Sequence, residues 1–92
     1  MLRITVQKQT GSRILQLEGR LAGAWVAELR TAWTSLTSTM TSDRLVVNLT
    51  ETFGIDANGR ELLREIHCAG AVLTGSGLFA KALVAEITGI RQ

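Results

Sequence analysis

"RLVVNLTETFGIDANGRELLREIHCAG", residues 44–70, is the most informative stretch about the fold, because a strand pattern and a helix pattern meet within it. Residues 44–49 are a short apolar run with two valines, which is typical of a strand buried inside a sheet. A polar junction at residues 56–59 follows, and a helical pattern then begins. The apolar positions on one face of this helix are Leu62, Leu63, Ile66 and Ala69, and Gly70 is placed to end it. The stretch therefore predicts a strand, a junction and a helix in immediate succession.

The residues before this stretch predict a hairpin and a first helix. Apolar and polar residues alternate over residues 2–7, which indicates a half-buried strand, and residues 13–19 indicate a second strand after a turn. Within residues 21–38, one helix face collects the apolar residues spaced by three and four: Val26, Leu29, Trp33 and Leu36. The polar segment 37–43 then connects this helix to the next strand.

The residues after it predict one more strand and one more helix. Residues 71–77 indicate a strand that runs into a glycine-rich turn, and residues 78–89 indicate the last helix. On that helix Leu78, Ala82 and either Ala85 or Glu86 lie in line. The expected order is β-β-α-β-α-β-α. Because strands separated by helices need crossover connections, we expect an α/β fold with a mixed sheet of about four strands and helices packed on one side.

The composition limits the classes of function. The 92 residues make one domain, and 46% apolar with 20% charged residues is ordinary for a folded chain. The net charge is only +2 and the basic residues are scattered, so no nucleic-acid partner is expected. A single cysteine, Cys68, allows no internal disulfide and fits a reducing cytoplasm. No stretch has the roughly 18 apolar residues of a membrane-spanning helix, so we expect a cytoplasmic protein without direct membrane insertion.

The junction at residues 56–59 permits two capping arrangements. Asp56 can be the N-cap of the following helix, or Asn58 can cap it with Glu61 completing a capping box. Gly59 lies in the first turn, where a missing side chain would leave open space for the close approach of a partner surface. Capping alone explains Asp56 or Asn58 completely, so the junction by itself does not establish a function.

Other residues fail the spacing tests for catalysis or metal binding. His67 and Cys68 are adjacent, so on a helix they point about 100° apart and cannot form a Cys–His catalytic pair. No metal-ligand spacing such as C-x-x-C occurs. "TGSG" (74–77) does not match a phosphate-binding loop, and Ser76 is expected to cap the last helix. We therefore expect no enzyme, no metal site and no cofactor.

Charged residues line the helix that starts at the junction. Arg60, Arg64 and His67 form one stripe, and Glu61, Glu65 and Cys68 form the adjacent one. A solvated charged face is the ordinary interpretation of such stripes. A docking surface for a protein partner is the more specific one, because the stripes begin at the turn that contains Gly59.

Taken as a whole, the chain resembles a STAS domain, the family of bacterial anti-sigma-factor antagonists and of the cytosolic tails of sulfate transporters. The residues that carry the resemblance are Leu17, Gly19 and Leu21, then Asn48 and Leu49, and then Asp56, Ala57, Asn58 and Gly59. They correspond to the family's leucine-x-glycine-x-leucine, its D-L or N-L pair, and its D-S-x-G or D-T-x-G at the helix start. The resemblance covers nearly the whole chain and implies a small sheet with helices on one side.

The resemblance also implies a docking switch at the junction. In phosphoswitch members, a partner anti-sigma kinase phosphorylates the serine or threonine directly after the aspartate, and the added charge abolishes binding. Ala57 stands at that position here, and Asn58 follows it, so we expect no phosphorylation within residues 53–62. Thr50 and Thr52 lie just before the junction, at a spacing that argues against them as substitutes. The residues expected to dock a partner are Thr52, Asp56, Ala57, Asn58, Gly59, Arg60 and Arg64.

Three functions are weighed on this basis. The favoured one is a non-enzymatic protein-interaction module of anti-sigma-factor-antagonist type, acting in transcription signalling with a kinase-like anti-sigma factor as partner. The second is a STAS accessory subunit of an ABC-type lipid transporter, contacting its ATPase, or a signalling scaffold; the missing hydroxyl raises this alternative. The third, a small-molecule or nucleotide binder or an enzyme, lacks a supporting motif.

The length of the chain leads to an expectation about its oligomeric state. Family members commonly continue with a further strand and helix, which this chain would lack. The sheet edge left uncovered would then be free to pair with a second copy, and this suggests a homodimer.

Overall fold

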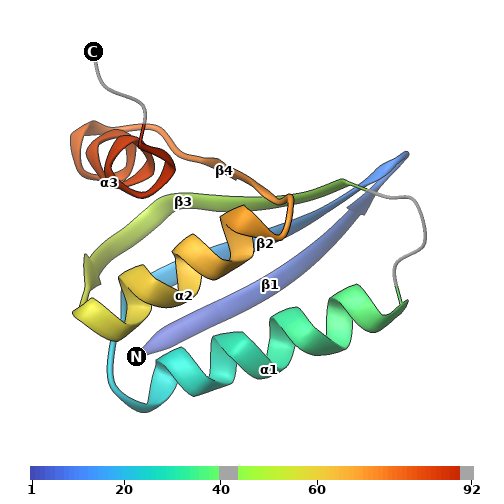
Figure 1. Ribbon diagram of the computed structural model, residues 1–92, viewed down its shortest axis with the longest axis horizontal. Helices are drawn as coiled ribbons and strands as arrows, with labels where there is room; N and C mark the ends of the chain where they lie inside the picture. The colour runs from blue at the N-terminus through green and yellow to red at the C-terminus, as the bar shows by residue number, and fades with distance from the viewer. Residues whose placement is uncertain (40–43, 90–92) are drawn as a thin grey trace.

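The computed structural model describes residues 1–39 and 44–89. Its elements follow the predicted order (Figure 1): β1 (Leu2–Gln9), β2 (Ser12–Leu21), α1 (Ala24–Thr39), β3 (Arg44–Ile55), α2 (Ala57–Cys68), β4 (Val72–Thr74) and α3 (Leu78–Thr88). The expectation of an α/β fold is thereby confirmed. Residues 40–43 of the predicted connection 37–43 lie outside the described residues.

The four strands form one mixed sheet in the order β1-β2-β3-β4. β1 and β2 pair as an antiparallel hairpin, whereas β2, β3 and β4 run parallel to one another. Because parallel strands end on the same side of a sheet, the three helices that follow them also start on that side. We call this side the carboxyl edge, and it comprises residues 20–25, 53–60 and 74–79. Met1 joins it, because its carbonyl accepts a hydrogen bond from the amide of Arg20 at 3.0 Å.

β3 is twice as long as the strand expected over residues 44–49, and its pairing with β2 shifts at two places. Relative to β2, β3 holds one extra residue between Asn48 and Glu51 and another between Thr52 and Gly54. Such bulges change which face the following side chains occupy, because side chains alternate along a strand. The second extra residue is Phe53, whose side chain is 69% exposed. The apolar-to-polar change after residue 49 therefore marks a bulge within the strand and not its end.

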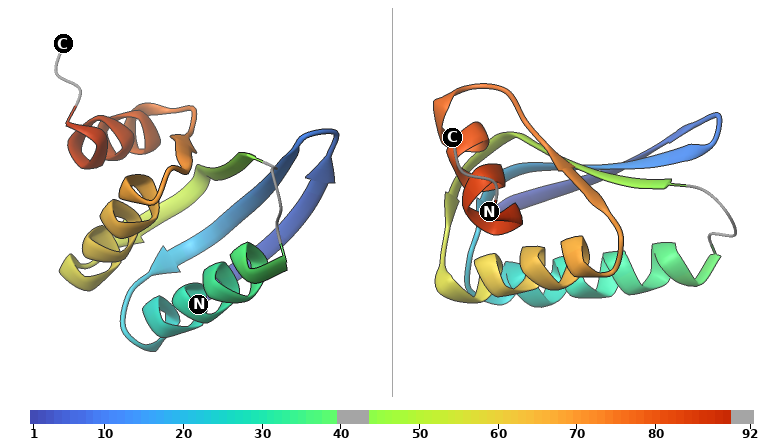
Figure 2. Two further views of the ribbon diagram at one scale, coloured as in Figure 1. Left: turned by 45° about the vertical axis from the view of Figure 1, so that its right-hand side comes forward. Right: turned by 45° about the horizontal axis from the view of Figure 1, so that its top comes forward.

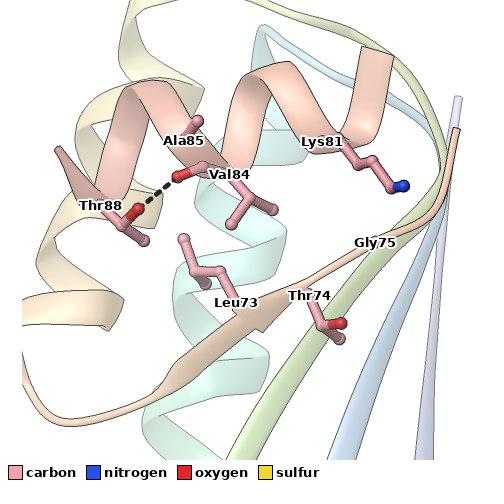
Figure 3. Close-up of a pocket in the computed structure, with 7 residues that line it drawn as sticks. All are labelled: Leu73, Thr74, Gly75, Lys81, Val84, Ala85 and Thr88. Carbon is pink, nitrogen blue, oxygen red and sulfur yellow. Dashed lines mark hydrogen bonds between the residues drawn. The ribbon is translucent and has the colours of Figure 1, made fainter. Parts of the chain in front are cut away.

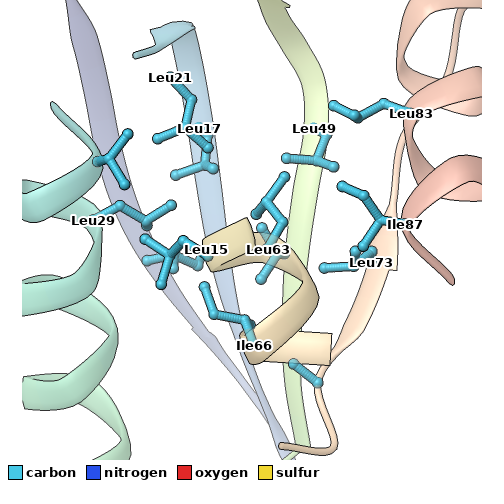
Figure 4. Close-up of a cluster of buried hydrophobic side chains, with 14 of the residues drawn as sticks. Leu15, Leu17, Leu21, Leu29, Leu49, Leu63, Ile66, Leu73, Leu83 and Ile87 are labelled. Atoms are coloured by element: carbon cyan, nitrogen blue, oxygen red, sulfur yellow. The ribbon is translucent and has the colours of Figure 1, made fainter. Parts of the chain in front are cut away.

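One hydrophobic core lies between the sheet and the helices, which all cover the same face of the sheet (Figure 2). Each strand and helix contributes to it, and Figure 4 shows the side chains pointing toward one another from the two layers. Its fully buried side chains are Leu15, Leu17, Leu21, Leu29, Val47, Leu49, Leu62, Leu63 and Ile66. Burying an aliphatic side chain of this size contributes about 1.5–3 kcal/mol, so these aliphatic residues are the main source of stability.

The predicted faces of α1 and α2 are largely confirmed. Val26 and Leu29 are buried, and Trp33 and Leu36 pack against the core from the same side of α1. On α2 the first three predicted positions are buried, whereas Ala69 is exposed at the C-cap. Within residues 1–39 and 44–89, no helix is long and apolar enough to cross a membrane.

The buried side of α3 is not the stripe that the spacing places in line. Leu78 is 91% exposed, and the buried side consists of Ala80, Leu83 and Ile87. α3 has apolar residues on nearly all sides, so periodicity alone did not distinguish its two faces. Leu78 and Ala82, which the spacing places in line on this helix, are both exposed.

Candidate functional site

The β3–α2 junction is organised by the carboxylate of Asp56. Asp56 has extended backbone geometry, and its Oδ1 accepts a hydrogen bond of 2.8 Å from the amide of Gly59. This contact is that of an N-cap, which satisfies one of the free amides at a helix start. Of the two capping arrangements, the structure therefore selects Asp56, and Asn58 does not cap.

The same carboxylate also holds the neighbouring junction. Oδ2 of Asp56 accepts a hydrogen bond of 3.0 Å from the amide of Gly23, which precedes α1. The amide of Asp56 in turn donates to the carbonyl of Leu21 at the end of β2, at 3.2 Å. The two amide hydrogen bonds, from Gly23 first and Gly59 second, lower the pKa of Asp56 below its ordinary value. Asp56 is thus a fixed anion that ties the starts of α1 and α2 together.

Beside this fixed carboxylate, Ala57 and Asn58 face the solvent. They form the first turn of α2, and their side chains make no hydrogen bond with any residue that the structure describes. Ala57 therefore occupies an exposed, ordered position directly after the aspartate, where a partner can contact it.

The predicted arginines lie on the outer part of α2 and are in ion pairs. Arg60 bonds through Nε to Glu86 of α3 at 2.9 Å, and Arg64 bonds to Glu61 on its own helix at 3.3 Å. On the other flank of α2, Glu65 forms an ion pair with Arg30 of α1. All these side chains are roughly half exposed, so solvent screens each pair and its contribution to the stability of the fold is small. The charged stripes thus face outward and also link α2 to both neighbouring helices.

Two of the predicted docking residues are wrong, because they are buried. Thr52 is 3% exposed, and its hydroxyl donates to the carbonyl of Leu17 in β2 at 3.1 Å. The bulge before Thr52 turns its side chain toward the core, so it can neither contact a partner nor accept a phosphate in this fold.

Gly59 is the second correction. A Cβ at this position would lie 2.7 Å from the carbonyl oxygen of Leu21 and 2.8 Å from Cγ1 of Ile55. The space above Gly59 is therefore filled by β2 and β3, and is not open to a partner. Glycine is needed here because the first turn of α2 presses against the end of β2.

Sequence reasoning missed several exposed apolar side chains at the carboxyl edge. Phe53, Leu78 and Phe79 are 69%, 91% and 43% exposed, and Trp25 and Met1 are exposed as well. Each of the three strand-to-helix junctions therefore carries at least one large apolar side chain in solvent. The bulge in β3 and the apolar stripes on both sides of α3 are the features that would have indicated these exposed side chains. Exposed apolar side chains gathered at one side of a small domain indicate a protein-binding surface.

A shallow hollow of about 270 Å³ lies beside Asp56. Arg20, Ala22, Gly54 and Ile55 line it together with Asp56, so it lies between the ends of β2 and β3. Arg20 is the only cation of this lining, and its side chain lies over Gly54. The surface of the β3–α2 junction is therefore concave beside Asp56.

The β4–α3 junction is built differently from the prediction. Gly77, and not Ser76, is the N-cap of α3, and no side chain within residues 1–39 and 44–89 caps this helix. The amide of Ser76 donates to Oγ1 of Thr50 at 3.1 Å, which fastens the loop to β3. Ser76 is displaced from the capping position because Gly77, with φ of 93°, makes the final turn into the helix.

The remaining polar candidates form no reactive cluster. Nδ1 of His67 lies 3.3 Å from the carbonyl oxygen of Ala71, and the thiol of Cys68 is free and exposed. In the described part of the chain, no group of three or more histidine, cysteine, aspartate or glutamate side chains could hold a metal ion.

Comparison with known proteins supports the fold. No protein-family model and no curated protein sequence matches the chain. Among solved structures, the crystal structure of Mglu is similar to 80% of this chain with a TM-score of 0.61 and 22% sequence identity. The chain spans 19% of the length of Mglu. At this identity the likeness shows a shared fold and nothing about activity.

Proposed function

We propose that this domain is a non-enzymatic protein-interaction module of the STAS type, which binds a partner protein at the carboxyl edge through the β3–α2 junction. The partner class that the resemblance implies is a kinase-like anti-sigma factor. The contact residues would be Asp56, Ala57, Asn58, Arg60 and Arg64, together with the exposed side chain of Phe53.

One observation carries the proposal: the β3–α2 junction is exposed, and several backbone hydrogen bonds hold its turn. Both carboxylate oxygens of Asp56 accept hydrogen bonds from backbone amides, so Asp56 positions the turn. Ala57 and Asn58 stand outward from that turn, and Phe53 supplies apolar area next to it. A preformed turn beside an exposed aromatic side chain fits protein recognition, because little conformational entropy is lost on binding.

Ala57 gives the proposed module its particular property. A hydroxyl at this exposed position could be phosphorylated, and its phosphate would add a charge of about −2 beside the anion of Asp56. With alanine there, the surface would stay in its binding-competent form, and the module would act as a constitutive binder. Thr52 is no substitute, because its hydroxyl is buried.

The test is a gain of function at residue 57. Binding to a purified anti-sigma kinase of the GHKL type is measured by calorimetry before and after incubation with ATP. We expect the unchanged protein to bind equally in both cases. Ala57→Ser should lose at least tenfold in affinity after ATP, with phosphate found on the introduced serine by peptide mapping. Ala57→Glu should bind weakly throughout, whereas Thr31→Glu, on the exposed side of α1, should bind normally. Normal binding by Ala57→Glu would refute the site.

The missing hydroxyl specifically favours a second candidate, an accessory subunit of an ABC-type lipid transporter or a scaffold. Such subunits do not need a phosphorylatable residue at the junction. The unchanged protein and the same three variants are then assayed against the purified transporter ATPase. Binding to the ATPase that Ala57→Glu weakens, with no binding to the kinase, would support this candidate over the first.

A further inference from the structure

A second surface lies apart from the β3–α2 junction, at the outer side of β4. The sheet ends at β4, and no described strand pairs with its outer side. β4 contains neither a charged residue nor a proline, which are the devices that commonly block the addition of another strand. Val72 is 42% exposed on this strand. The peptide groups of β4 therefore offer an open template for strand pairing, although only three residues long.

Directly beside this open side is a pocket of about 210 Å³ between β4 and α3 (Figure 3). Figure 3 shows Leu73 of β4 and Val84 of α3 pointing toward one another, with Lys81 at one end and Thr88 at the other. No residue of β3 is among the residues that line the pocket, which lies between β4 and α3 (Figure 3). Small-molecule sites usually exceed roughly 300 Å³, so this pocket suits one or two side chains better than a whole metabolite.

The charge of the pocket indicates what kind of side chain it accepts. Among the described residues that line the pocket, Lys81 is the only ionisable one, and it forms no salt bridge with any of the described residues. The hydroxyl of Thr88 is already engaged, because it donates to the carbonyl of Val84 at 2.7 Å. A lone cation at the rim of an apolar pocket is complementary to an anionic group attached to an apolar one.

We propose that the outer side of β4 binds an extended segment of a partner protein, which adds to the sheet as a fifth strand. One aliphatic side chain of the segment enters the pocket between Leu73 and Val84. An acidic side chain two residues away lies on the same face of the added strand, about 7 Å further along, and pairs with Lys81. Main-chain pairing supplies affinity and the pocket supplies specificity, as in other cases of strand addition. Because β4 is short, the affinity should be modest, with Kd on the order of 10–100 μM.

The proposal is tested with a display library of random dodecamer peptides panned against the full chain. Enriched peptides should share an aliphatic and an acidic residue spaced by two positions. In NMR titrations they should shift the amides of residues 72–74 and 81–88. Binding should weaken at least tenfold in Lys81→Glu, and panning on that variant should enrich a basic residue at the acidic position. Val84→Trp, which fills the pocket, should also bind at least tenfold more weakly, and its melting temperature shows whether this variant folds. Because Lys81 is exposed, Lys81→Glu tests the proposal even if Val84→Trp does not fold.

Three results would overturn the proposal. The first is that no peptide is enriched, and the second is that enriched peptides bind Lys81→Glu and the unchanged protein equally. The third is a homodimer in sedimentation that Lys81→Glu dissociates, because a second copy would then occupy the surface. Ala57→Glu is the matched control: it should bind the peptides normally, so failure of the junction proposal and failure of this one are distinguishable.

Discussion

The two junctions that start α2 and α3 have the same place in the fold and are built in opposite ways. Both follow a parallel strand and lie at the carboxyl edge. The β3–α2 junction is a direct turn, in which the carboxylate of Asp56 satisfies backbone amides of two loops. The β4–α3 junction passes through residues 75–77 and starts its helix at Gly77 without a side-chain cap. The first junction is held by the charge-assisted hydrogen bonds of one carboxylate. The second is held by the hydrogen bond from the amide of Ser76 to Thr50, by glycine conformation and by apolar packing.

The difference suggests a division of roles between the two surfaces. A junction held by several hydrogen bonds presents one shape, which suits a partner that recognises a fixed turn. A junction with fewer restraints can adjust, which suits a groove that must accept an added strand. If the two surfaces differ in this way, substitutions at the start of α2 should have larger effects on stability than substitutions at the start of α3.

The strongest test of the fixed junction is Gly59→Ala. Its new methyl group would lie 2.7 Å from a backbone oxygen of β2, which cannot move without shifting the strand. We expect unfolding in urea to show a loss of about 2–3 kcal/mol. Asn58→Ala, one residue earlier and exposed, is the control and should change stability by less than about 0.5 kcal/mol. Equal stability of the two variants would show that α2 is not pressed against β2.

One substitution at each helix start tests whether α2 and α3 are capped differently. Asp56→Ala removes the hydrogen bonds to Gly59 and Gly23, and we expect its melting temperature to fall by about 5 °C or more. Ser76→Ala should leave the melting temperature within about 2 °C, because Gly77 and not Ser76 caps α3. Differential scanning calorimetry measures both. A fall in Ser76→Ala as large as in Asp56→Ala would mean that the two junctions are built alike.

The same contrast explains what the sequence could and could not predict. The order of elements was predictable because each helix and strand has its own period, and the faces of α1 and α2 follow from it. The length of β3 was not, because its two bulges interrupt the alternation that marks a strand. α3 is apolar on both sides, so its period did not identify the side that packs on the sheet.

At the candidate site, the limits have a different physical origin. The capping role of Asp56 is local, and local spacing restricted the choice to two residues. Thr52 and Gly59 were misplaced because their partners, Leu17 and Leu21, belong to a strand more than thirty residues earlier. No local pattern reports which distant backbone will fill the space beside a glycine. The exposure of Phe53 was not predicted because Phe53 is the extra residue of the second bulge, and the bulges also concealed where β3 ends.

A smaller effect is the acid dependence that Asp56 confers. Its pKa is lower in the folded than in the unfolded chain, so its charged form stabilises the fold above about pH 4. That contribution is lost as the pH falls through the folded pKa. Asp56→Asn can still cap through its oxygen but has no charge to protonate. We therefore expect the unchanged protein to have the higher melting temperature at pH 7, and the difference to shrink as the pH falls below about 4.

A difference that is independent of pH would contradict this assignment. It would mean that Asp56 acts through shape alone, and that the charge of the carboxylate adds nothing to the fixed junction. Measurements at constant ionic strength exclude screening as the cause of any change.

The smallest effect concerns the ion pair of Arg60 and Glu86, which joins α2 to α3. Both side chains are more than 40% exposed, so the coupling energy from a double-mutant cycle with alanine should be about 0.5 kcal/mol. It should fall further in 1 M salt. A coupling above about 1.5 kcal/mol would contradict the contrast between the junctions, because α3 would then be held by the same charged network as α2. A small coupling would leave α3 restrained mainly by Ala80, Leu83 and Ile87, and so able to adjust over the pocket beside β4.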